Sequence, residues 1–128
     1  MTTPQDMMQI GQALVEHCQN GKEAELMQNY YSPDAISAEA VEMPGMGREV
    51  KGLEAIIAKG EWWMNAHEIH SSSVEGPFVH GNSQFSVIFD MDVTEKASGT
   101  RTQMREIGTY HVENGKIVRE EFSYAVGE

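Results

Sequence analysis

Two glutamates and one histidine are the residues of this chain best suited to acid–base chemistry. Glu39 and Glu106 lie in segments with strand-like patterns, where one face of a sheet would be covered. Burial disfavours the charged form of a carboxyl group, so its pKa rises toward the range in which it can both take and give a proton. His70 shares its strand face with Glu68 and Ser72, and imidazole titrates near neutral pH. We therefore predict Glu39, Glu106 and His70 as catalytic candidates.

The same residues have simpler explanations, which the sequence leaves open. Either glutamate could lie at a strand end in water, or be held in an ion pair by Arg105, Arg119 or Lys116, and His70 could lie on the surface. His67 and His70 form a His-x-x-His pair across an expected helix–strand boundary, without a third ligand nearby in the sequence. We therefore predict no metal site and no cofactor.

Four aromatic side chains are candidates for holding a ligand. Aromatic residues of this kind more often belong to an ordinary core, but rings with polar tips are also typical of cavity linings. We predict that a small, apolar, oxygenated ligand contacts the following residues: Trp63, Tyr110, Phe122 and Tyr124.

The segment 84–93, QFSVIFDMDV, is the element that must position these groups. Apolar and polar residues alternate along it, with Ile88 as the exception, and this is the period of a β-strand with one buried face. A lone strand cannot bury five large side chains, so neighbouring strands and covering helices are required. Further strands are expected at 35–41, 68–75, 101–112 and 116–125.

Three helices are expected before most of the strands. Residues 6–19 and 23–31 carry apolar side chains at helical spacing, and Asn20 with Glu23 would form a capping box for the second helix. A third helix opens at Gly52, while 43–47 has the composition of a loop and Gly76-Pro77 that of a strand break. The order of these elements predicts one α+β domain over 1–128, with consecutive antiparallel strands and helices on one face of the sheet.

The register of the last hairpin decides which carboxylates face the covered side. A loop of three residues, Glu-Asn-Gly, would pair Tyr110 with Val118 and turn Glu120 to that side. A two-residue Asn-Gly turn would bring Glu121 there instead. We favour the three-residue loop, because it keeps the aromatic residues of the last strand inside. Glu106 shares the face of Tyr110 in both registers.

Charge and cysteine content restrict the partners and the compartment. The chain has 20 acidic and 9 basic residues, and its formal net charge of −11 opposes binding to nucleic acid or to an anionic membrane. Its one cysteine, Cys18, permits no internal disulfide, and no segment is long and apolar enough to span a bilayer. The first residues lack the basic and apolar regions of a secretory signal. We expect a cytoplasmic protein.

Four short segments together resemble the SnoaL-like branch of the nuclear transport factor two-like superfamily. They cover nearly the whole chain in order and spacing: Tyr31-Ser32-Pro33-Asp34-Ala35, Val50-Lys51-Gly52-Leu53-Glu54-Ala55-Ile56, Glu61-Trp62-Trp63 and Asn114-Gly115-Lys116-Ile117-Val118. The resemblance implies a cystatin-like α+β fold, a conical barrel in which a curved antiparallel or mixed sheet wraps around N-terminal helices. It also implies a hydrophobic pocket between helices and sheet, and a homodimer formed through the outer sheet face.

Ketosteroid isomerase is the member of this superfamily with the clearest chemistry. The resemblance matches its general base to Glu39, but it matches its two oxyanion-stabilising groups to Leu14 and Gly108, which cannot donate a side-chain hydrogen bond. We therefore expect no ketosteroid isomerase activity. Two hypotheses remain: a cofactor-independent isomerase, cyclase or hydratase acting on a small apolar oxygenated molecule, or a non-catalytic module for small-ligand binding or dimerisation.

Overall fold

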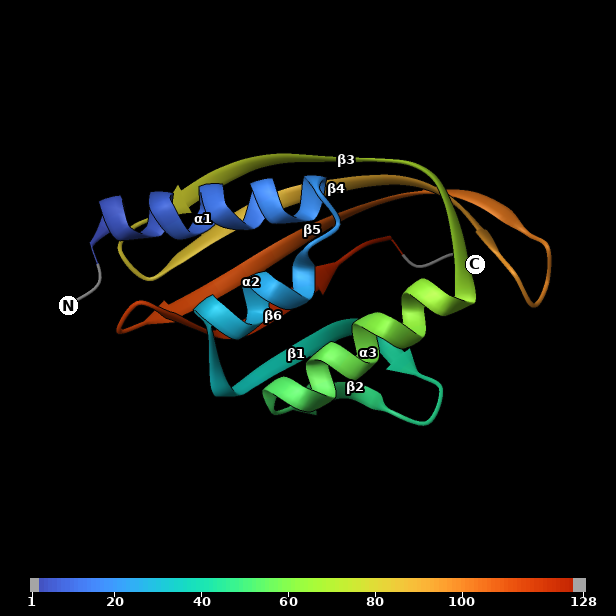
Figure 1. Ribbon diagram of the computed structural model, residues 1–128, viewed down its shortest axis with the longest axis horizontal. Helices are drawn as coiled ribbons and strands as arrows, with labels where there is room; N and C mark the ends of the chain where they lie inside the picture. Colours follow the sequence, from blue (N-terminus) through green and yellow to red (C-terminus); the bar gives the residue numbers. More distant parts are fainter. Residues whose placement is uncertain (1–2, 126–128) are drawn as a thin grey trace.

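One curved sheet carries three helices on a single face (Figure 1). The computed structural model describes residues 3–125. The strands lie in the order β2-β1-β6-β5-β4-β3. The elements are α1 (Pro4–Gln19), α2 (Glu23–Tyr30), β1 (Tyr31–Met43), β2 (Gly47–Lys51), α3 (Leu53–Ala66), β3 (His67–His80), β4 (Gln84–Glu95), β5 (Arg101–Glu113) and β6 (Lys116–Ser123).

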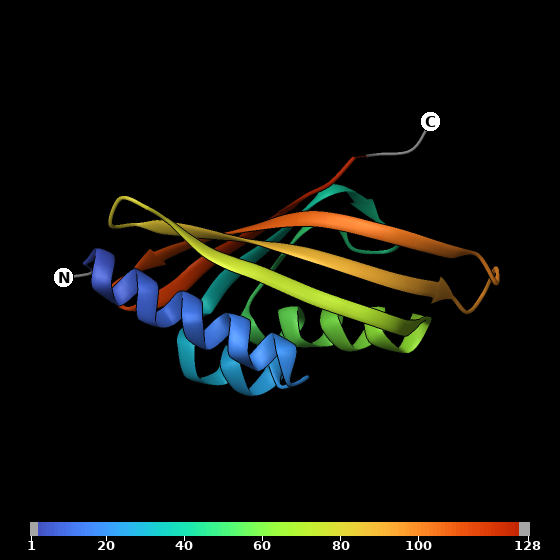
Figure 2. The same ribbon diagram turned by 90° about the horizontal axis from the view of Figure 1, so that it is seen from above.

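The sheet is mixed, since β1 and β6 run parallel and the other neighbouring pairs are antiparallel. Figure 2 shows the strands curving over the helices, which all lie below the sheet in that view. The predicted α+β class with a curved mixed sheet is confirmed, and the consecutive strands β3 to β6 pair antiparallel as expected. The parallel pair forms because the last strand, β6, returns to lie beside β1, which comes first in the chain.

The helix ends differ from those predicted. Helix α1 starts earlier than expected, because Thr3 Oγ1 accepts a hydrogen bond from the Asp6 amide and the Asp6 carboxylate accepts one from the Thr3 amide. The capping box predicted for α2 is wrong. Its N-cap is Lys22, which makes no side-chain cap, while Asn20 closes α1 and donates its side-chain amide to the Glu16 carbonyl.

Two strand predictions are also wrong in detail. The loop at 43–47 is followed by the short strand β2, whose residues GREVK do not alternate and which is recognisable only by its pairing with β1. Strand β3 continues through Gly76-Pro77, where the pairing with β4 shifts instead of ending. Both differences arise because a neighbouring strand supplies hydrogen bonds that a local pattern does not reveal.

The last hairpin has a register that differs from both alternatives. Asn114 and Gly115 have φ of 51° and 77°, so they form a two-residue turn, and the predicted three-residue loop is wrong. The pairing then shifts at Val118, which is an extra residue on β6, and beyond it Tyr110 pairs with Glu120. This bulge returns Glu120 to the covered face even though the turn is of the two-residue type.

The core lies between the covered face of the sheet and the helices. Phe85, Val87 and Val93 of β4 are buried, as their alternation predicted. Helix α1 contributes Leu14 and α3 contributes Ile56 to the same side. Burying each of these side chains stabilises the fold by about 1.5–3 kcal/mol, which holds the helices against the sheet.

A close approach between α1 and β3 makes Gly11 a sensitive position. A Cβ atom added there would lie 2.5 Å from Pro77 Cβ and 2.7 Å from Pro77 Cγ, which belong to a rigid ring. We expect Gly11→Ala to lower the free energy of unfolding by about 1–3 kcal/mol through overpacking. The matched control is Gly60→Ala in α3, where an added Cβ meets open space, and it should raise stability by about 0.5–1 kcal/mol. Urea unfolding of both variants measures the contrast, and equal effects would contradict the packing argument.

Candidate active site

A buried carboxylate anchors a polar network on the covered face of the sheet. Glu120 of β6 is 3% exposed, and it accepts hydrogen bonds from Tyr31 and from Ser37 of β1, the latter at 2.6 Å between Ser37 Oγ and Glu120 Oε2. The parallel pairing of β1 with β6 places Ser37 opposite Glu120. Burial raises the pKa of Glu120, while the two hydroxyl donors oppose that shift.

Lys59 of α3 extends this network to a second carboxylate. Its Nζ donates to Ser37 Oγ at 2.8 Å and forms an ion pair with Glu39 Oε2 at 2.6 Å. The Lys59 and Glu39 side chains are 11% and 12% exposed, so the pair is largely shielded but still reaches solvent. The Tyr124 hydroxyl donates to Glu39 Oε1 at 3.1 Å. A continuous set of polar contacts therefore runs from Tyr31 to Tyr124.

Glu106 of β5 is the third carboxylate of the cluster. It lies on the covered face, paired across the strands with Phe89, and no side chain among residues 3–125 donates a hydrogen bond to it. Burial raises its pKa to about 7, the negative charge of Glu39 adds to the rise, and the charge of Lys59 opposes it. A carboxyl group with a pKa near neutrality can act as both base and acid.

Aromatic rings form the apolar wall beside these carboxylates. Phe122 lies with its ring centroid 6.4 Å from those of Phe89 and Tyr110, and Lys59 Nζ is 5.6 Å from the Phe122 centroid. Gly108 lets these rings close up, because a Cβ there would lie 3.0 Å from the Phe89 ring and 3.1 Å from the Tyr110 ring. The wall removes water from the carboxylates, which is the cause of the raised pKa values.

A hollow of about 640 Å³ adjoins the cluster at Tyr124. It opens between β3, β4, β5 and the residues after β6, and its volume is typical of small-molecule sites. Its lining combines apolar with polar groups: His67, Val93, Glu95, Ser98, Thr100, Thr102, Gln103, Met104, Arg105, Tyr124 and Ala125.

The structure brings together five of the seven residues predicted from the sequence. Their side chains form the network and its wall: Glu39, Glu106, Tyr110, Phe122 and Tyr124. His70 is not among them. It is exposed on the outer face, which it shares with Glu68 as predicted, and its Nε2 lies 2.7 Å from Thr94 Oγ1. The outer face lies away from the carboxylates, so His70 takes no part in the network. Trp63 lies apart from the network and stacks on His67, with 4.2 Å between the ring centroids.

Three members of the network were missed in the sequence: Tyr31, Ser37 and Lys59. Glu120 was expected on the covered face but not as a site residue. Lys59 left a signal, because it lies one helical turn before Trp63 on the apolar stripe of the third helix. A lysine at such a position needs an acidic partner, and that requirement points to a carboxylate on the sheet below.

Comparison with protein families decides where the chain belongs. A family model, described as the SnoaL-like domain, matches residues 3–124. The chain is a member of the SnoaL-like family. This confirms the resemblance carried by the four short segments. Among curated proteins, none matches the chain.

Solved structures agree with this assignment. The SnoaL-like chain is similar to a candidate SnoaL-like polyketide cyclase from Mesorhizobium loti, also described as a carbohydrate phosphatase, with 42% identity, a TM-score of 0.84 and coverage of 91% of this chain and 97% of that chain. It is similar in fold to an NTF2-like protein from Burkholderia thailandensis, with 17% identity, a TM-score of 0.75 and coverage of 98% and 92%. A protein with a cystatin-like fold from Xanthomonas campestris shows 14% identity, a TM-score of 0.74 and coverage of 94% and 91%.

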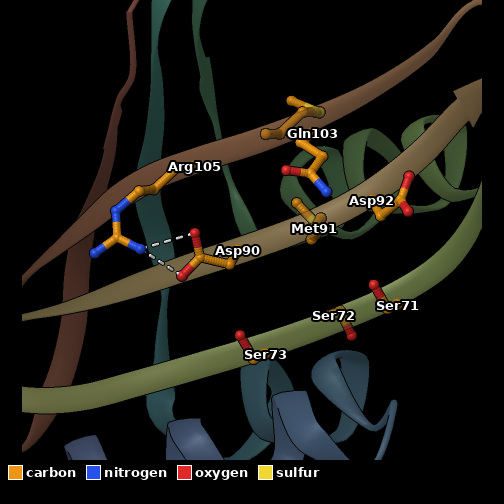
Figure 3. A pocket seen from close by; sticks show the side chains of 9 residues that line it. Ser71, Ser72, Ser73, Asp90, Met91, Asp92, Gln103 and Arg105 are labelled. Carbon is orange, nitrogen blue, oxygen red and sulfur yellow. Dashed lines mark hydrogen bonds and ion pairs between the residues drawn. The ribbon is translucent and has the colours of Figure 1, made fainter.

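The outer face of the SnoaL-like sheet is polar, and its charged side chains form ion pairs with one another. Arg105 forms an ion pair with Asp90 at 2.7 Å, and Arg101 forms one with Asp92 at 2.8 Å. A hollow of about 450 Å³ lies along β3, β4 and β5, and it is lined by Ser71, Ser72, Ser73, Asp90, Met91, Asp92, Gln103, Met104 and Arg105. Figure 3 shows these side chains, with Arg105 and Asp90 joined by their ion pair. The homodimer expected through this face stays a prediction. No helix in the described part of the chain has the length and hydrophobicity needed to cross a membrane.

The raised pKa of Glu106 predicts how the stability of this SnoaL-like protein depends on pH. The pKa is about 7 in the folded state, above the ordinary glutamate value of 4.5, so between these two pH values the folded state holds a proton that the unfolded chain releases. Stability therefore falls as pH rises through this window, and the full cost of an ionised Glu106 is present above about pH 7. We expect Glu106→Gln to raise the free energy of unfolding by about 1–3 kcal/mol well above neutrality and to change it little below about pH 4. Urea unfolding across pH measures this, and a gain independent of pH would contradict it.

Proposed function

We propose that this SnoaL-like protein is a cofactor-independent enzyme of the cyclase, isomerase or hydratase kind, acting on a small, largely apolar, oxygenated molecule. The observation that carries the proposal is Glu106, a carboxyl group without a hydrogen-bond donor among the described residues, set against an aromatic wall with a pKa of about 7. A group in this state can take a proton from carbon and return it to another atom in one catalytic cycle.

The two nearby carboxylates have different roles in this proposal. Glu39 forms an ion pair with Lys59, and its charge raises the pKa of Glu106. Glu106 is the group that exchanges a proton with the substrate.

The shape of the site supports a carbon skeleton with a few oxygen atoms. Phe89, Phe122 and Tyr110 offer apolar ring surface, and Tyr124 reaches from the cluster to the hollow. The polyketide cyclase description of the Mesorhizobium loti relative agrees with such a substrate. Its second description, carbohydrate phosphatase, has less support in this chain, because three carboxylates around one lysine would repel a phosphate dianion.

Proton exchange in deuterium oxide tests the proposal. The purified protein would be incubated with a panel of 1,3-diketones and hydroxylated polycyclic ketones, and deuterium at carbon would be followed by NMR. We expect protein-dependent exchange for at least one compound that also raises the melting temperature. Compounds that raise the melting temperature without exchange or turnover would show a non-catalytic binder, the alternative hypothesis. A panel without any effect on melting temperature would contradict the ligand site itself.

A further inference from the structure

We propose that Lys59 is a catalytic residue that binds the substrate oxygen on which negative charge develops, so that the site selects molecules with a carbonyl group next to an acidic C–H bond. This inference rests on the proposed function and extends it from the proton-transfer group to the group that stabilises the resulting anion. It depends on how Lys59 is held, on which of its hydrogen atoms is available, and on the charges around it.

Lys59 has one N–H donor to spare. An ammonium group has three N–H donors, and the described residues accept two of them through Glu39 Oε2 and Ser37 Oγ. Its Nζ lies 5.6 Å from the Phe122 centroid, beside the aromatic wall, and its side chain keeps 11% of its surface exposed. A ligand resting on the wall would therefore meet the third donor without displacing either protein partner.

The residues behind Lys59 fix the ammonium group in advance. The Ser37 hydroxyl donates to Glu120, so its oxygen is left to accept from Lys59. Tyr31 donates to the other oxygen of Glu120, and Glu120 is 3% exposed. Donors that are already oriented before the reaction stabilise a developing charge without a reorganisation cost. Tyr31, Ser37 and Glu120 are thus positioning residues for Lys59.

The charges around Lys59 favour an anion on the substrate oxygen once Glu106 has taken the proton from carbon. In the proposed step the C–H bond breaks and its proton goes to Glu106. Its electron pair forms a C=C bond, and the π pair of the carbonyl group moves to the oxygen to give an enolate. The charge that Glu106 loses appears on the substrate oxygen, so the net charge of the cluster is unchanged. Glu39 and Glu120 also face Lys59, from β1 and β6, and Tyr124 donates to Glu39. The enolate gains the hydrogen bond of Lys59, which an ionised Glu106 against Phe89 lacks.

Binding of 4-nitrophenol tests this role without any turnover. Its anion mimics an enolate oxygen and absorbs visible light, whereas its neutral form does not. We expect the wild-type protein to take up the anion, seen as increased visible absorbance, and Lys59→Met to bind it about 10- to 100-fold more weakly. Lys59→Arg should retain anion binding. Equal anion binding by Lys59→Met, uptake of the neutral form alone, or no binding to the wild-type protein would overturn the proposal.

Two further variants make the result unambiguous. Lys51→Met removes an exposed lysine of β2 and should leave binding unchanged. Lys59→Met combined with Glu39→Gln removes the unpaired buried carboxylate, so weak binding by the folded double variant reports the lost donor and not unfolding. The proposed function fails separately, because unchanged proton exchange in Glu106→Gln would contradict it whatever the binding result.

Discussion

Glu106→Gln is expected to lower kcat/KM for the identified substrate by about 10²–10⁴, the contribution of a general acid–base group. Glutamine keeps the shape of the side chain on the covered face of β5 but cannot exchange a proton. In the wild-type protein, kcat/KM should rise with pH through about 7 if the carboxylate form is the base, because that is the pKa of Glu106. Steady-state kinetics across pH measure both effects.

Glu113→Gln is the matched control for this substitution. Glu113 lies on the same strand but is exposed beside the last turn, so its loss should leave both kcat/KM and the pH profile unchanged. A Glu106→Gln protein with wild-type kcat/KM would show that another group moves the proton. A slower Glu106→Gln variant whose kcat/KM still rises with pH near 7 would show that this rise belongs to a different titrating group.

Lys59→Met is expected to lower the free energy of unfolding by about 3 kcal/mol. The substitution leaves Glu39 nearly buried without its ion-pair partner, at 12% exposure, and takes away a donor to Ser37. Adding Glu39→Gln should restore more than half of the loss, because the second change removes the uncompensated charge. Urea unfolding at neutral pH gives the four corners of the double-mutant cycle.

The outcome of this cycle separates two views of the Lys59–Glu39 pair. A large coupling energy shows that the two charges depend on each other in the folded protein, as the 2.6 Å distance indicates. Single and double variants with the same loss of stability would mean that the Lys59 stem, packed near Phe122, contributes the effect and that the ion pair adds nothing.

Several parts of this protein followed from the sequence alone. The alternation in 84–93 predicted a half-buried strand, and burial of Phe85, Val87 and Val93 confirms it. Glu106 shares the covered face with Tyr110 because β5 runs without a shift beside β4, so the period of two residues holds between them. The residues of four short segments also indicated the SnoaL-like family, and the match of the family model over residues 3–124 confirms it.

The tertiary structure alone decided the rest of the site. One extra residue at Val118 turns Glu120 inward, and one at His70 leaves that histidine on the outer face but brings Ser72 to the covered face, since a bulge reverses the faces of every residue beyond it without changing the local composition. Ser37 and Glu120 are 83 positions apart and meet only because β1 pairs with β6. Lys59 forms its ion pair with Glu39 only because α3 packs on the sheet. Such contacts depend on long-range pairing, which residue spacing does not encode.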